Sequence, residues 1–178
     1  DTIAGIAGVE NIVGGSGTNT YVFADGATLT GNISGGSNVL DYSAYTTSVS
    51  VDLDTSTATG VSGTVANIVN VIGGLGNDTL TGANDSNTWA ITGVNTGSVD
   101  GVSFSNIENL AGGSAADRFT FTGGSVTSVA GGGGADTLDL SADSLGVTVD
   151  LTAGTATYAL SSPIFERIEI DHPGGMTV

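Results

Sequence analysis

The chain has 178 residues, 30 of them glycine, no cysteine or lysine, and a net charge of −16 at neutral pH. The lack of cysteine excludes disulfides and thiolate metal sites, and the negative charge argues against nucleic acid as a partner. No apolar run reaches the roughly 20 residues of a membrane helix, so no membrane insertion is expected. Frequent Val, Ile and Thr, with few helix-forming residues, predict an all-β protein with tight turns.

The first predicted strands lie in two segments that recur later in the chain. "VENIVGGSGTNTYVF" (9–23) falls on "IENLAGGSAADRFTF" (107–121) at a shift of 98 residues without a gap. "LDYSAYTTSVSVDLDTSTAT" (40–59) falls on 138–157 at the same shift. This super-repeat predicts a single domain over 1–178, with units of about 9–106 and an incomplete 107–178. The chain is expected to be a fragment of a longer repeat protein.

A shorter period lies inside the large one. Glycine-led segments begin at Gly14, near Ile33, and at Gly73, Gly112 and Gly131. One or two steps of roughly 20 residues separate each start from the next. A step of this size is typical of one coil of a parallel β-solenoid, so about nine coils are predicted. A β-sandwich has similar alternation, but it does not need a repeat of this kind.

Apolar residues fall at every second place within the predicted strands, which indicates one buried face. The residues expected to point inward are Ile12, Tyr21, Phe23, Val71, Leu110, Phe119, Phe121, Leu138, Leu140, Val147, Val149 and Leu151. Trp89 is expected as a core filler or at an exposed edge. Glu10 and Glu108 are expected on a solvated face.

Two segments match the nonapeptide Gly-Gly-x-Gly-x-Asp-x-apolar-x in full, at 73–81 and 131–139. The segment 112–120 departs at Ala115, while Asn19 and Asn38 replace the Asp in the two earlier copies. In this motif the glycines permit the positive φ that turns carbonyls toward a cation. The Asp adds a charged oxygen, and the apolar residue fills the core.

These segments resemble the RTX family of haemolysin-type calcium-binding repeats, and the "NIENL" segments before Gly-Gly turns are similar to tandem-repeat surface proteins and adhesins of bacteria. The resemblance implies calcium between stacked loops, held by position-six aspartates and glycine carbonyls. Carried over, the best site pairs Asp117 with Asp136, because the two lie one short step apart. The glycines of this site would be Gly112, Gly113, Gly131, Gly132 and Gly134.

The perfect motif at 73–81 is expected to bind calcium more weakly through Asp78. Its follow-on segment "GANDSNTWA" (82–90) is an imperfect copy, and no matched loop lies one coil away. Asn19 and Asn38 carry no charge, so they are expected to stack as an amide ladder.

These observations predict a structural and adhesive repeat module of a secreted or cell-surface protein, extracellular and partly stiffened by calcium. Its partners would be neighbouring repeats of the same polypeptide or identical subunits, joined end to end into filaments through open strand edges. With one histidine and two arginines the chain is not expected to be an enzyme. The alternatives are an ice-binding solenoid, from the Thr-x-Thr spacing at 57–59 and 155–157, and a polysaccharide-active β-helix enzyme.

Overall fold

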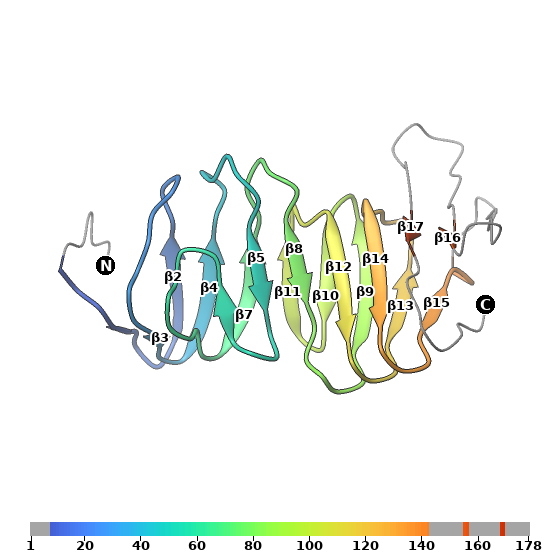
Figure 1. Ribbon diagram of the computed structural model, residues 1–178, viewed down its shortest axis with the longest axis horizontal. Helices are drawn as coiled ribbons and strands as arrows, with labels where there is room; N and C mark the ends of the chain where they lie inside the picture. The colour runs from blue at the N-terminus through green and yellow to red at the C-terminus, as the bar shows by residue number, and fades with distance from the viewer. Residues whose placement is uncertain (1–7, 143–154, 157–167, 170–178) are drawn as a thin grey trace.

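The computed structural model describes residues 8–142, together with two short strands at 155–156 and 168–169. These residues form strands, turns and bends, and no helix occurs among them that could cross a membrane. The strands lie side by side in an elongated array (Figure 1). The prediction of an all-β protein rich in parallel strands is therefore confirmed.

The largest sheet has eight strands: β2 (Thr18–Val22), β4 (Ser37–Asp41), β7 (Ile68–Ile72), β9 (Thr88–Gly93), β10 (Thr96–Val99), β11 (Val102–Ser105), β13 (Arg118–Phe121) and β15 (Thr137–Asp139). Their spatial order is β15-β13-β9-β10-β11-β7-β4-β2. All neighbours in this sheet are parallel except at β10, which is antiparallel to both β9 and β11.

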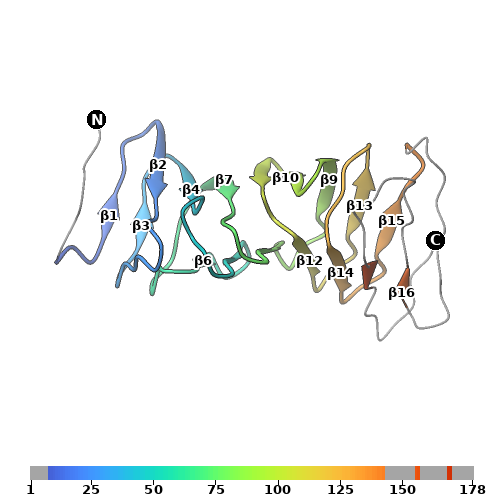
Figure 2. The ribbon, with the colours of Figure 1, turned by 90° about the horizontal axis from the view of Figure 1, so that it is seen from above.

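The second sheet has five strands: β5 (Ser50–Asp52), β6 (Thr57–Ala58), β8 (Thr79–Thr81), β12 (Asn109–Gly113) and β14 (Ser128–Gly132). Their order is β14-β12-β8-β5-β6. Two smaller sheets pair β1 (Ile12–Val13) with β3 (Ile33–Ser34), and β16 (Thr155–Ala156) with β17 (Ile168–Glu169). Seen from above, the eight-stranded sheet follows one long side of the molecule, and β12 and β14 lie on the opposite side (Figure 2).

The spacing between paired strands takes more than one value. The pairs β2/β4, β12/β14 and β13/β15 join positions that differ by 19, as in Asn19↔Asn38. The pairs β8/β12 and β9/β13 join positions that differ by 30, as in Trp89↔Phe119. The prediction of one uniform step is therefore wrong, because the β5–β6 hairpin and the β9–β10–β11 meander add residues between successive parallel strands.

The shift of the super-repeat relates strands that pair with each other in the same way. The pair Thr20↔Val39 of β2 and β4 becomes Arg118↔Thr137 of β13 and β15. Much of the second predicted unit, including Val147, Val149 and Leu151, lies outside the described residues, as do the side chains of Thr155 and Thr157.

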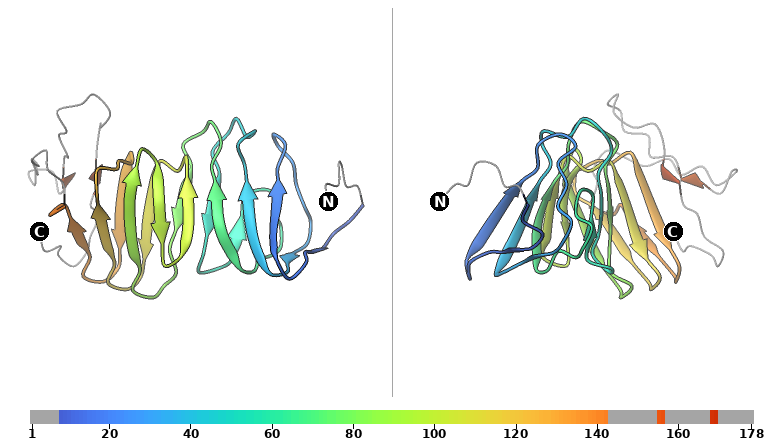
Figure 3. Two further views of the ribbon diagram at one scale, coloured as in Figure 1. Left: turned by 180° about the vertical axis from the view of Figure 1, so that it is seen from behind. Right: turned by 60° about the vertical axis from the view of Figure 1, so that its left-hand side comes forward.

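The core lies between the two large sheets, and the chain passes repeatedly from one to the other (Figure 3). The alternation expected from the sequence is present, because Phe119 and Phe121 on β13 are fully buried and Leu138 on β15 is 8% exposed. Trp89 is a core residue, 0% exposed, and its ring stacks on that of Phe119 with centroids 5.4 Å apart. The remaining expected core residues are buried (Phe23, Val71, Leu110) or partly buried (Ile12, Tyr21, Leu140).

Candidate functional site

The residue at position six of each glycine segment lies at or next to the first residue of a strand. Five of these residues are buried polar side chains: Asn38, Asp78, Asn87, Asp117 and Asp136. A buried carboxylate is costly unless hydrogen bonds compensate for its lost hydration. The partners of these side chains therefore indicate what the motif does in this protein.

The predicted pair Asp117 and Asp136 is brought together by the parallel pairing of β13 with β15. Oδ1 of Asp136 accepts a hydrogen bond from the backbone N–H of Asp117 at 3.0 Å. Oδ1 of Asp117 accepts two more, from the backbone N–H of Asn87 at 2.7 Å and from its Nδ2 at 2.8 Å. Three successive segments are thus joined through side chains, and we call Asn87, Asp117 and Asp136 the polar ladder.

The first glycine of each motif leaves room for the carboxylate of the same motif. A Cβ placed on Gly112 would lie 2.2 Å from Oδ2 of Asp117, and one on Gly131 would lie 2.3 Å from Oδ2 of Asp136. Such distances are far below van der Waals contact, so glycine is required here for space. Gly132, at φ 91°, is required for its backbone conformation as well.

Asp78 lies in a different place from the polar ladder, before β8 in the five-stranded sheet. Its Oδ1 accepts the backbone N–H of Val49 at 2.7 Å, and its Oδ2 accepts that of Gly74 at 2.6 Å. Its own N–H donates to Oε2 of Glu108 at 2.9 Å. The neighbours of Asp78 across the sheet are therefore not glycine motifs.

Glu108 is half-buried, which corrects the expectation of a solvated face; Glu10 is exposed as expected. Oε1 of Glu108 accepts a hydrogen bond from Nδ2 of Asn95 at 2.7 Å. Burial raises the pKa of Glu108 above its ordinary value, and the charge of Asp78 acts in the same direction against the hydrogen bonds. Glu108 thus belongs to the polar network of the five-stranded sheet.

The two asparagines of the first unit make the contact expected of an amide ladder. Nδ2 of Asn19 donates to Oδ1 of Asn38 at 3.1 Å. Asn87, at position six of the imperfect segment 82–90, was not among the predicted site residues, yet it supplies the donors to Asp117. The sequence could have indicated Asn87 as a site residue, because Asn already occupies position six in two other copies of the motif.

The donor set around the predicted calcium site consists largely of N–H groups. Calcium takes six to eight oxygen ligands, whereas Oδ1 of Asp117 and of Asp136 both face N–H donors. The carbonyls of Gly112 and Gly113 also accept N–H groups, from Asn87 and Gly133. Within the described residues no three His, Cys, Asp or Glu side chains group so as to hold a metal ion. These contacts fit a hydrogen-bonded ladder better than a cation cage.

One oxygen of the polar ladder is different. Oδ2 of Asp117 is buried and has no hydrogen-bond partner. Burial raises the pKa of Asp117 above its ordinary value, although the hydrogen bonds from Asn87 oppose the shift. Among the described residues Oδ2 of Asp117 is the one buried carboxylate oxygen without a partner, and it could accept a proton or an ion.

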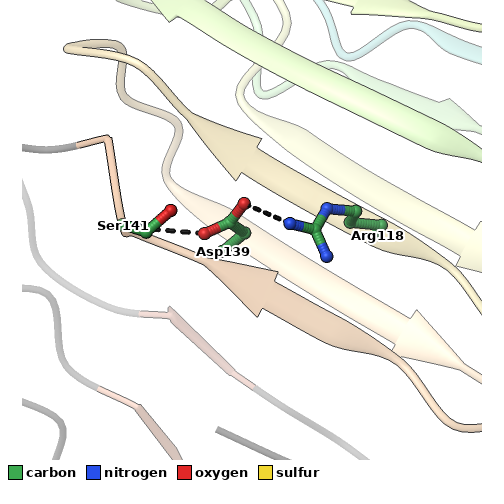
Figure 4. Close-up of polar contacts among 3 residues, drawn as sticks. All are labelled: Arg118, Asp139 and Ser141. Atoms are coloured by element: carbon green, nitrogen blue, oxygen red, sulfur yellow. Dashed lines mark hydrogen bonds and ion pairs between the residues drawn. The ribbon is translucent and has the colours of Figure 1, made fainter.

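An ion pair lies on the surface beside the polar ladder. Arg118, at the start of β13, contacts Asp139, the last residue of β15, and the backbone N–H of Ser141 donates to Oδ1 of Asp139 at 3.0 Å (Figure 4). The hydrogen bonds from Ser141, and then the charge of Arg118, lower the pKa of Asp139. Because Arg118 is more than half exposed, this pair contributes little to stability.

Searches of protein-family models, of curated proteins and of solved structures find no match to this chain.

Proposed function

We propose that this chain is a parallel β-solenoid that serves as a structural and adhesive repeat module of a secreted or cell-surface protein. The parallel pairing of strands at a short and a long recurring offset supports this architecture, with coils of unequal length in place of nine equal ones. The RTX-like glycine segments would then serve as the turns of the coils.

The observation that carries the proposal is the polar ladder. Oδ1 of Asp117 and Oδ1 of Asp136 hold N–H groups of the preceding segment, and Oδ1 of Asp78 does the same for Val49 in the other sheet. Hydrogen bonds to charged groups contribute about 1.5–3 kcal/mol each. Carboxylates used in this way join one coil to the next, which is what a rigid spacer requires.

The described surface has a hollow of about 170 Å³, and none of its lining residues carries a titratable side chain: Leu53, Ser56, Val65, Asn67, Ile68 and Val102. Catalytic sites instead bring titratable groups together in a cleft. A structural role accounts for the acidic residues without a reaction.

Ice binding is the weaker alternative. An ice-binding face needs free, regularly spaced threonines, but Oγ1 of Thr59 accepts the backbone N–H of Ser50 at 2.8 Å, and Oγ1 of Thr57 lies 2.9 Å from that of Thr55. These hydroxyls already have partners within the chain.

Calcium stays in the proposal as a stiffening ion for one reason, which is the buried, unpartnered Oδ2 of Asp117. Asp136 would support such an ion from the next coil. Asp78, whose two oxygens both accept N–H groups, is the poorer candidate.

Small-angle X-ray scattering of the full chain tests the architecture. A compact globular chain of 178 residues has a radius of gyration of about 16 Å. At about 4.8 Å per strand the eight-stranded sheet is only about 40 Å long, so a single module keeps a radius of gyration close to this globular value. The solenoid should instead give an asymmetric, rod-like distance distribution with a long tail, and a symmetric, bell-shaped distribution would contradict the proposed architecture.

A further inference from the structure

The two ends of the internal repeat are not equally covered. At the shift of the super-repeat, β1 and β2 correspond to residues of β12 and β13. β12 has β8 on its second edge, and β13 has β9. Within the described residues β2 ends the eight-stranded sheet and β1 pairs with β3 alone. Among residues 8–142, the edge formed by β1 and β2, which we call the open edge, therefore lacks the strands that its second copy has.

The exposure of equivalent side chains shows the effect of this difference. Val9 is 44% exposed, whereas its counterpart Ile107 is 0% exposed. Tyr21 is half-buried, whereas its counterpart Phe119 is 0% exposed and stacks on Trp89. The open edge carries apolar residues at places where the second unit buries them.

The polar groups of the open edge differ from their counterparts in the second unit in the same way as the apolar groups do. In the second unit Glu108 accepts the N–H of Asp78 and Nδ2 of Asn95. Its counterpart in the first unit is Glu10, which is exposed. The backbone N–H of Arg118 likewise donates to the carbonyl of Asn87 at 2.9 Å, and the counterpart of Arg118 is Thr20.

We propose that the open edge binds a segment equivalent to residues 73–98, brought by another unit of the same repeat. The strand equivalent to β8 would lie beside β1, with Leu80 paired to Ile12, as Leu80 pairs with Leu110. The strand equivalent to β9 would lie beside β2, with Trp89 paired to Tyr21, as Trp89 pairs with Phe119. Glu10 would accept hydrogen bonds from the residues equivalent to Asp78 and Asn95, as Glu108 does. The inference rests on the proposed function as a repeat module, and it adds the register in which the strands of two units would pair.

An extended chain tests this register. A second copy of residues 73–98 is placed directly before Asp1, which continues the super-repeat without a gap. Hydrogen exchange of single amides is then measured in the extended and in the original chain. The counterparts of Asn109, Arg118 and Thr122, whose N–H groups donate to residues 78–91, are Asn11, Thr20 and Ala24. Their exchange should slow by about tenfold or more, because the new strands supply the missing carbonyls.

The matched control carries the same extension with Trp89→Lys and Ile91→Lys in the added copy. This variant keeps the length of the extension but cannot bury the strand equivalent to β9, so the amides of Thr20 and Ala24, whose counterparts donate to residues of β9 and the residue before it, should exchange as in the original chain. Equal protection in both extended chains, or protection in neither, overturns the proposal. Scattering of the original chain tests the module function separately, so a rod with unprotected amides would reject this register and leave the function standing.

Discussion

At the scale of single residues, buried acids of this protein have backbone amides as partners. Asp78 and Glu108 are linked through the N–H of Asp78, and Asn95 donates to the other oxygen of Glu108. Burial removes water from the carboxyl group of Glu108 and so raises its pKa. Such a group favours folding most when it is protonated.

The Glu108→Gln variant should have a flatter dependence of stability on pH. Because the pKa of Glu108 is higher in the folded than in the unfolded state, its contribution is full below the ordinary value of 4.5 and is lost as pH rises through the folded value. As pH rises above about 4.5, the wild-type melting temperature should therefore fall more steeply than that of the variant. Melting curves followed by circular dichroism at several pH values measure the two slopes.

Glu10→Gln is the matched control, because it removes the same charge from the equivalent, exposed position. Its slope should equal that of the wild type. If both variants flatten the slope equally, the effect belongs to net charge and the assignment to Glu108 is wrong.

The residues of the candidate site were predictable where the motif recurs at the short spacing. Asp117 and Asp136 are neighbours because their separation equals the pairing offset of β13 and β15. Asn87 could be recognised as position six of the segment 82–90, but its contact with Asp117 could not, because the two residues lie 30 positions apart, a distance that no local period indicates. The N–H partners of the carboxylates could not be foreseen either, since the motif specifies an acid and not the direction of its oxygens.

At the scale of elements, the contact between β9 and β13 organises the middle of the core. Trp89 stacks on Phe119 and is tilted toward Phe104 of β11 at 6.1 Å between ring centroids. Nε1 of Trp89 is buried without a hydrogen-bond partner. The indole thus combines a large apolar contact with an unsatisfied donor.

Trp89→Phe should cost less than about 1.5 kcal/mol, because it keeps the stacked ring and removes the unsatisfied N–H. Trp89→Ala should cost about 3–5 kcal/mol through the cavity that it leaves. Urea unfolding followed by circular dichroism gives both values. Val94→Ala, at a residue 58% exposed, should stay within about 0.5 kcal/mol. Equal losses for the Phe and Ala variants would show that the stacked ring does not matter.

The antiparallel strand β10 is the main element that the repeat did not predict. Asp100 and Gly101, with φ of 45° and 90°, form the turn between β10 and β11. An Asp-Gly pair between two strand-like runs is a strong hairpin signal, because such turns need positive φ at both positions. The expectation of coils of equal length left no place for this hairpin, although its local signal is present in the sequence.

At the scale of the whole molecule, the net charge of −16 acts against a compact fold. Any added cation screens this repulsion, so a rise in stability with calcium is not by itself evidence of a site. Screening of the net charge and binding at a site can be told apart by comparing ions of equal charge.

A calcium site at Asp117 predicts that calcium raises the melting temperature more than magnesium at equal ionic strength, since bound ligand stabilises the folded state. The excess should disappear in Asp117→Asn and persist in Asp85→Asn, an exposed residue with the same change of charge. Equal effects of the two ions on the wild type would assign the whole rise to screening. The carboxylates would then act as hydrogen-bond acceptors alone.

The strand β10 also bears on how the chain reaches its fold. Strands in the parallel pairs must close long loops before they meet, whereas β10 pairs with β11 through a turn at Asp100 and Gly101 and with β9 through another near Asn95. Loop closure slows folding as contacts become more distant in sequence. The β9–β10–β11 meander is therefore the place where folding is expected to begin. From this nucleus, order would spread toward β7 on one side and toward β13 on the other.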